Sequence, residues 1–287
     1  MRSIFVATLS AALSSGPAPA PLHVTAPAGI LQPGSVLLVT ITSDSALTAV
    51  RARAFGRELS PFPVDSRTWQ VLVGIDLDVK PGPYPVEIES GDPGTKTTYS
   101  LSVKARRFPT RTLTVDPDLV TPPPQEMARI AREAERLRRL WTTGPAGPRL
   151  WDGAFIRPVP DPANSSFGTR SIYNGQPRSP HSGTDFLSGT GRAIKAPNAG
   201  RVVIAEALYF TGGTVVIDHG LGVLSLFAHL SAIAVHEGDL VKTGDVIGEV
   251  GATGRVTGPH LHWAVRVAGA RVDPLLLLSA LSGQTGR

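Results

Sequence analysis

The stretch that decides the fold of the second half of the chain reads GRVVIAEALYFTGGTVVIDHGLGVLSLFAHL, residues 200–230. Val, Ile, Leu and Thr concentrate in three short segments, 200–208, 212–220 and 223–230, with glycine-containing turns between them. Short apolar and β-branched runs bounded by turn residues are typical of β-strands. With a further run at 245–254, they predict that residues 151–287 form an all-β domain.

A second β-rich region precedes this domain. Five runs between residues 24 and 105 are rich in Val, Ile, Leu and Thr, and Pro, Gly, Asp and Ser separate them: 35–43, 48–56, 69–77, 84–90 and 97–105. Short strands at this spacing favour a small immunoglobulin-like β-sandwich over residues 21–106. No catalytic pattern is present in it, so we expect an accessory role.

A connector, residues 107–150, joins the two β regions. Thr121 and three following prolines form a suitable helix start. Residues 125–141, QEMARIAREAERLRRLW, then place apolar side chains at helical spacing along one stripe. We therefore expect one helix here, packed on one of the two β domains, with its arginines on a solvated face.

Composition narrows the class of protein. The chain has 287 residues, of which 41% are hydrophobic and 18% charged, as expected for a globular protein with a real core. It has no cysteine, which excludes disulfides, thiolate zinc sites and a cysteine nucleophile. The net charge of +5 indicates either a mildly basic surface or an anionic partner, such as a cell wall. A nucleic acid is not favoured as that partner, because the sequence has no nucleic-acid-binding motif.

The N-terminus predicts export. Residues 1–20 contain Arg2, a short apolar stretch and a small-x-small sequence at 18–20, as in a cleaved signal peptide. The apolar stretch is too short to span a bilayer. We expect an extracytoplasmic, periplasmic or secreted, bacterial protein with no transmembrane segment after cleavage.

Paired histidines mark the second domain as the place of the chemistry. In TGPHLHWAV, residues 257–265, His260 and His262 are two apart. Side chains alternate along a strand, so both imidazoles project to one face while Leu261 and Trp263 face the core. Such a pair can provide one metal ligand and one group that handles protons.

Two further motifs fit a metal site. In HSGTDF, His181 and Asp185 can converge because Gly183 permits a tight turn, and an imidazole with a carboxylate suits Zn²⁺. His229, in LFAHLS, would alone be interpreted as a core histidine. Three protein ligands and an open position are standard for catalytic zinc, so His181, Asp185 and one of the paired histidines are the candidate ligands. The remaining two histidines could then act as acid–base groups beside them.

The runs HSGTDF, IKAPNAGRVV, VVIDHG, SLFAHLS and GDLVKTGDVIGEVGATGRVTGPHLHW together resemble the lysostaphin-like (LytM-like) zinc metalloendopeptidases over about residues 152–278. The resemblance implies a compact antiparallel β-sheet domain of the duplicated hybrid motif type, with a groove over the sheet. It implies one Zn²⁺ per chain, bound by His181, Asp185 and His262, with His229 and His260 as the catalytic pair. It also implies hydrolysis of the peptide part of bacterial peptidoglycan.

Several alternatives stay open. Tyr173, Asn174 and Arg178 precede the ligand loop and could line a substrate groove or simply close a loop. The cleaved bond could be a cross-link between D-alanine and a diamino acid, or a glycine bridge. The N-terminal domain could dock onto the wall, block the groove or act as a spacer. A non-catalytic wall-binding protein, or an activator of another hydrolase, is the rival function, and the five filled histidine and aspartate positions argue against it. The string at 235–250 also resembles the hairpin of lipoyl carriers, which leaves the histidines unexplained.

Overall fold

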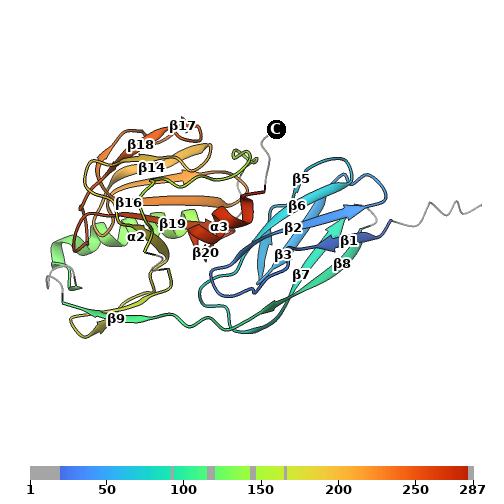
Figure 1. The fold of residues 1–287 in the computed structure, drawn as a ribbon, viewed down its shortest axis with the longest axis horizontal. Helices are drawn as coiled ribbons and strands as arrows, with labels where there is room; N and C mark the ends of the chain where they lie inside the picture. The colour runs from blue at the N-terminus through green and yellow to red at the C-terminus, as the bar shows by residue number, and fades with distance from the viewer. Residues whose placement is uncertain (1–19, 92–93, 115–119, 143–146, 165–166, 284–287) are drawn as a thin grey trace, which may run out of the picture.

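A computed structural model describes residues 20–91, 94–114, 120–142, 147–164 and 167–283. The expected signal peptide falls almost wholly outside these ranges. Within them, no helix is long and apolar enough to cross a membrane. The chain is mostly strands with few helices, which confirms the all-β class (Figure 1).

The N-terminal part is a sandwich of two antiparallel four-stranded sheets. One sheet contains β1 (Leu22–Thr25), β2 (Val36–Ser43), β6 (Thr68–Gly74) and β5 (Phe62–Pro63), in that order. The other contains β4 (Arg57–Leu59), β3 (Val50–Ala54), β7 (Gly82–Ser90) and β8 (Thr95–Val103). Alternate residues such as Val39, Ile41, Val71 and Ile88 point inward and form one apolar core between the sheets. The five predicted runs are therefore strands, with ends shifted by a few residues.

A nine-stranded sheet carries the second half of the chain. Its main path is β12 (Gly183–Phe186), β19 (Leu261–Val267), β16 (Val223–Ile233), β15 (Gly212–Asp218), β14 (Gly200–Leu208) and β17 (Leu240–Val241). Three further strands branch from it: β13 (Ala193–Lys195), β18 (Val246–Val250) and β20 (Ala270–Val272). All its pairings are antiparallel, which agrees with the predicted sheet type.

The two faces of this sheet differ. On β19, Leu261, Trp263, Val265 and Val267 belong to a large apolar core. The alternate residue Ala264 belongs to a separate, smaller cluster on the opposite face. We call the first the core face and the second the site face, because His262 lies beside Ala264 in this alternation.

Helices cover each face in part. The 3₁₀ turn η1 (Pro124–Glu126) leads into α2 (Met127–Thr142), whose Leu137, Leu140 and Trp141 pack on the site-face cluster. The predicted helix is thus confirmed, and it packs on the second β domain. A helix that the sequence analysis did not predict, α3 (Pro274–Leu281), packs into the large core.

The connector also contains a strand. β9 (Thr110–Leu113) pairs in parallel with β10 (Arg170–Tyr173), and β10 pairs with β11 (Gln176–Pro177) in a small third sheet. The segment that follows the sandwich therefore forms a sheet with strands from the second half of the chain. In Figure 1 this small sheet, with β9, lies beside the nine-stranded sheet.

The sandwich is firmly docked. Val36, Leu38 and Leu72 of the sandwich belong to the same apolar core as the core face of the large sheet. A Cβ on Gly74 would come within 3.1 Å of atoms of Val267, Ala270 and Val272, so the backbones approach closely there. Asp76 accepts hydrogen bonds from the backbone and guanidinium of Arg271 at 2.5–3.1 Å. The domain boundary that we predict at residues 106 and 107 therefore does not divide the hydrophobic core.

Candidate metal centre and catalytic cavity

Three predicted ligands converge on one point. β12 pairs with β19 so that Asp185 lies opposite His262. His181 lies just before β12, and its Nε2 is 2.9 Å from Asp185 Oδ1 and 2.9 Å from His262 Nδ1. His262 Nδ1 is also 2.9 Å from Asp185 Oδ1. One donor atom from each residue therefore lies within reach of a single small cation.

Glycine is required in the middle of this group. A Cβ on Gly183 would lie 2.5 Å from the carbonyl oxygen of Trp263 and 2.7 Å from the His262 ring. Such a contact is too short for any other residue type without a shift of the strands. Gly183 is therefore required for the close approach of β12 to β19. The tight turn that the HSGTD spacing predicts is not formed, because Gly183 lies in the extended strand β12, opposite Ala264.

The protonation states favour metal binding. Burial alone would raise the pKa of Asp185, but hydrogen bonds from His181 and His262 outweigh it and hold that pKa well below its usual range. Burial lowers the pKa of His262, so its imidazole is neutral near pH 7. An ionised carboxylate and neutral imidazoles are the forms in which these side chains ligate metals.

A bulge turns His229 toward the same point. Phe227 pairs with Val215 and Leu230 with Gly213, so β16 has one residue more than β15 in this interval. His229 lies in the bulge with φ of 71°, a left-handed conformation that is unusual for any residue but glycine. Its ring centroid lies 4.9 Å from that of His260. Strict alternation would instead have placed His229 on the core face.

Backbone carbonyls fix the tautomers of the two remaining histidines. His229 Nδ1 lies 2.9 Å from the carbonyl oxygen of Thr253, and His260 Nδ1 lies 2.9 Å from that of Gly258. A carbonyl can only accept, so each Nδ1 carries the hydrogen and each Nε2 is left as a base. Burial, together with the neighbouring histidines His262 and His260, lowers the pKa of His229 to about 3, so the ring is neutral at pH 7.

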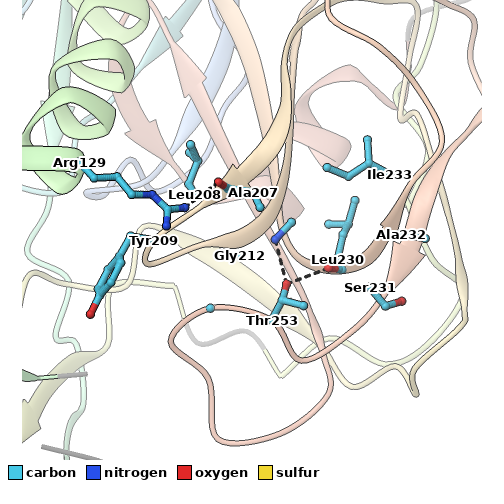
Figure 2. A pocket seen from close by; sticks show the side chains of 12 residues that line it. Arg129, Ala207, Leu208, Tyr209, Gly212, Leu230, Ser231, Ala232, Ile233 and Thr253 are labelled. Carbon is cyan, nitrogen blue, oxygen red and sulfur yellow. Dashed lines mark hydrogen bonds between the residues drawn. The ribbon is translucent and has the colours of Figure 1, made fainter. Parts of the chain in front are cut away.

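Hydrogen bonds of Thr253 fix the position of the loop whose backbone carbonyl binds His229. The Thr253 hydroxyl donates to the carbonyl of Leu230 and accepts from the amide of Gly213, both at 2.8 Å (Figure 2). A Cβ on Gly212 would lie 2.2 Å from this hydroxyl, which shows how closely the β14–β15 turn and the Thr253 loop approach. A cavity of about 480 Å³ lies beside this contact, and Arg129 of α2 forms part of its wall. Thr253 thus acts on His229 through its own carbonyl and does not itself line the catalytic cavity.

The five residues open into a cavity of about 410 Å³. Tyr173 lines this cavity, and its role in substrate binding stays a prediction. Asn174 lies in the two-residue turn between β10 and β11, with φ of 49°, and Arg178 donates to the carbonyl of Val120. Neither Asn174 nor Arg178 is among the described lining residues. Their substrate-binding role stays a prediction, while the structure gives both a local structural one.

Several lining residues were not anticipated. Arg111 and Leu113 come from β9, and Phe210, Thr211 and Arg255 come from the loops on either side of the Thr253 contact. Arg255 lies over the Phe210 ring, with Cζ 4.4 Å from its centroid. Arg111 had no signal in the sequence, because only the parallel pairing of β9 with β10 brings it here. The described lining residues include none from the sandwich sheets, so nothing in this structure supports a sandwich that blocks the cavity.

Another buried histidine lies on the core face. His219 is fully buried, with Nδ1 2.8 Å from the Ala199 carbonyl and Nε2 3.0 Å from Ser225 Oγ. Both nitrogens are used inside the protein, and its ring packs edge-on against Phe155. It is therefore a structural residue, and the chemistry belongs to the site face.

The donor set fits a catalytic metal. Two imidazoles and a carboxylate are ligands that Zn²⁺ accepts, and three protein ligands leave a position open to the cavity. The imidazoles of His229 and His260 lie beside them. An all-β protein with this arrangement belongs, by its site, to the class of metal-dependent hydrolases.

Comparisons with known proteins give the family. Residues 179–274 match the model of Peptidase family M23. A crystal structure described as an M23 peptidase from Pseudomonas aeruginosa is 34% identical in sequence and superposes with a TM-score of 0.70. The alignment includes 88% of this chain and 96% of the Pseudomonas aeruginosa chain. The chain belongs to peptidase family M23.

Curated relatives match over about a third of the chain. Peptidoglycan DD-endopeptidase ShyB of Vibrio cholerae is 40% identical over 96 residues, which is 33% of this chain and 22% of that protein. DD-carboxypeptidase/endopeptidase Mpg of Neisseria meningitidis is 42% identical over 95 residues, with the same two shares. The match thus spans less than a quarter of the length of these relatives.

Proposed function

We propose that this protein is a zinc-dependent endopeptidase that hydrolyses peptide bonds in bacterial peptidoglycan. The observation that carries the proposal is the convergence of His181 Nε2, Asp185 Oδ1 and His262 Nδ1 at the floor of an open cavity. The names of the curated relatives supply the substrate class. An exported location, periplasmic or secreted, follows from that substrate.

His181, Asp185 and His262 would hold the metal. When bound there, zinc supplies a Lewis acid that polarises the scissile carbonyl and acidifies water. The protein contributes the ionised carboxylate of Asp185 on β12, the neutral imidazole of His262 on β19, and the imidazole of His181 just before β12. The substrate would lie in the cavity, with its scissile bond over this floor.

His229 and His260 would handle the protons. Both rings present Nε2 as a base, because both Nδ1 hydrogens are held by backbone carbonyls. One imidazole takes the proton from the attacking water. The protonated ring can then hydrogen-bond the developing oxyanion or deliver the proton to the leaving amine.

Digestion of purified peptidoglycan tests the proposal. Zinc-loaded full-length protein and its His181→Ala variant are incubated with the same wall preparation, and the soluble fragments are analysed by mass spectrometry. Fragments that end at a hydrolysed peptide bond, and that the variant does not release, would support the proposal and identify the bond.

The rival function gives a different result. If the wall stays intact while the wild-type protein sediments with it, the protein binds the wall or activates another hydrolase. Intact wall and no binding would contradict peptidoglycan as the substrate. Circular dichroism of the His181→Ala variant checks that its fold is unchanged.

A further inference from the structure

The catalytic cavity has a positively charged wall. Arg111 and Arg255 both line it, whereas Asp185 is the one carboxylate among its described lining residues. Asp185 contacts His181 and His262. The free space of the cavity is therefore bordered by cationic groups.

Strand pairing places Arg111 beside the cavity. β9 and β10 pair in parallel with Arg111 next to Ser171 and Leu113 next to Tyr173. Side chains two apart share a face of a strand, so Arg111 and Leu113 lie on the face that carries Tyr173. Leu113 and Tyr173 also line the cavity, which confirms the direction of this face.

The partner of Arg111 is neutral. Its Nε donates to Ser171 Oγ at 3.1 Å, and this bond orients the guanidinium without neutralising it. No carboxylate of the described chain lies within ion-pair distance of Arg111. A half-buried guanidinium oriented in this way has Nη hydrogens to donate to an anion.

Arg255 contacts an aromatic side chain of the same small sheet. Its Cζ lies 5.8 Å from the Tyr173 ring centroid and 4.4 Å from that of Phe210. Burial lowers the pKa of Arg255, Tyr173 opposes this shift, and the charge of Arg178 adds to it. The two rings restrict where the guanidinium can lie, and a guanidinium is a planar donor that matches a carboxylate.

We propose that Arg111 and Arg255 form a carboxylate-binding wall, through which the protein prefers peptides that carry a carboxylate next to the scissile bond over neutral glycine bridges. The inference rests on the proposed function for the identity of its substrate as a wall peptide. It adds a specificity determinant, Arg111, that lies outside the residues matched by the family.

The chemistry of cross-links explains what this wall would distinguish. When D-alanine acylates the side-chain amine of meso-diaminopimelate, a free carboxylate sits on the carbon next to the scissile nitrogen. A glycine bridge has no such group. Two oriented guanidinium groups recognise a planar carboxylate by charge-assisted hydrogen bonds, which a carboxamide of the same shape cannot replace.

Binding to the metal-free full-length protein tests the wall without requiring catalysis. The probes are the D-alanyl–meso-diaminopimelate cross-link and its twin with that carboxylate converted to a carboxamide. Calorimetry is done after chelation at pH 8, so that neither a metal nor a protonated imidazole can bind the carboxylate. We expect the acid to bind about tenfold to a hundredfold more tightly than the amide, as for loss of a charge-assisted hydrogen bond.

Variants assign the effect to the wall. Arg111→Gln should remove most of the preference for the acid, and Arg111→Lys should keep part of it because the charge remains. The matched control is Arg170→Gln. Arg170 is an exposed arginine of the same small sheet, and it is not among the lining residues of the cavity. This control should keep the full preference, and thermal unfolding should show that all three variants are folded.

The outcomes separate the two proposals. Equal binding of acid and amide to the wild-type protein, no binding of the acid at millimolar concentration, or a preference that persists in Arg111→Gln would each overturn the carboxylate wall. None of these depends on whether the loaded protein cleaves peptidoglycan. In the cleavage assay, Arg111→Gln should raise KM for the acid cross-link toward that of the amide and leave kcat unchanged. Failure of the wild-type protein to cleave any wall peptide would reject the endopeptidase function alone.

Discussion

The core face and the site face of the nine-stranded sheet are made by the same strands, but they differ in what their residues do. On β19, Trp263 and Val265 are fully buried in the core that also receives the sandwich and α3. His262 and Ala264 point the other way, toward α2 and the cavity.

The two faces each contain a buried histidine, His219 on the core face and His229 on the site face. His219 uses both nitrogens within the protein, whereas His229 keeps Nε2 as a base. Alternation along a strand can therefore place residues that stabilise the fold on one face of the sheet and residues that carry out chemistry on the other.

The largest effect should come from a ligand on the site face. His181→Ala removes one of three converging donors, so the protein should lose tight zinc binding and about a thousandfold or more of its peptidase activity. The measurements are zinc content after dialysis and the rate of cleavage of a cross-linked wall peptide. Because His181 contributes no apolar core contact, the thermal unfolding midpoint of the metal-free protein should change little. A variant that keeps both zinc and activity would contradict the proposed ligand set.

The acid–base pair should separate activity from metal binding. His229→Ala or His260→Ala should each lower kcat about 10²–10⁴-fold, the usual contribution of a positioned acid–base group. Zinc content should stay near one ion per chain in both, since neither residue is among the three converging donors. Full activity in either variant would reject that residue as part of the pair, and loss of zinc would make it a ligand instead.

A core-face substitution should have the opposite signature. Leu277 of α3 is fully buried in the large core, so Leu277→Ala should lower the free energy of unfolding by about 2–5 kcal/mol. Its neighbour Leu276 is 36% exposed and gives the matched control, with an expected change below about 1 kcal/mol. Chemical denaturation measures both, and kcat at low temperature should remain that of the wild type. A large fall in kcat for folded Leu277→Ala would show that the two faces are coupled.

Alternation made much of this site predictable from the sequence. The period of two in PHLHW places His260 and His262 on one face and Trp263 on the other, as the structure has them. Gly183 between His181 and Asp185 predicts that the two side chains converge, but by a tight turn. The structure instead uses Gly183 in a strand, where a side chain would collide with β19. The predicted strands and the helix also follow from local patterns of apolar residues, with ends that shift by a few residues because side-chain patterns do not define hydrogen-bond limits.

The rest of the site depends on contacts between distant segments. The direction of His229 is set by a bulge in β16, which strict alternation gets wrong. Arg111 reaches the cavity because β9 pairs with β10, and the two strands are 60 residues apart. The helix α3 carried a local signal, since Asp273 caps it and Pro274 begins it, but its apolar run was too short to distinguish from a strand. Docking of the sandwich rests on packing at Gly74, for which no sequence pattern exists.

The histidine on the core face predicts sensitivity to acid. Burial lowers the pKa of His219 to about 4, from the usual 6.5 of a histidine. The native state therefore resists protonation, so its contribution to stability is complete above about pH 6.5 and is lost as pH falls toward 4. At pH 5 the loss should be about 2 kcal/mol relative to pH 7. Asp218, whose pKa is raised by burial, acts in the opposite direction at lower pH.

Matched variants isolate the contribution of His219. In His219→Gln, the fall in the free energy of unfolding between pH 7 and pH 5 should be smaller than in the wild type by about that amount, whatever the variant costs at pH 7. His236 is an exposed histidine, so His236→Gln should leave the pH dependence unchanged. An identical acid slope in His219→Gln and the wild type would show that His219 is not the group responsible.

The smallest effect should come from the ion pair that joins the sandwich to β20. Hydrogen bonds from Arg271 outweigh burial and hold the pKa of Asp76 at about 2, so the carboxylate is ionised and paired at neutral pH. Asp76→Asn should lower the free energy of unfolding by about 1–2 kcal/mol, because solvent screens part of the interaction. Asp78 also pairs with Arg271 but is 78% exposed, so Asp78→Asn is the control and should change stability by less than about 0.5 kcal/mol.

Neither variant should alter kcat, since the pair lies beyond the core face and outside the cavity lining. If Asp76→Asn lowered kcat while the protein stayed folded, the sandwich would be acting on the catalytic cavity through β19 and β20, and the separation of stability from chemistry between the two faces would fail.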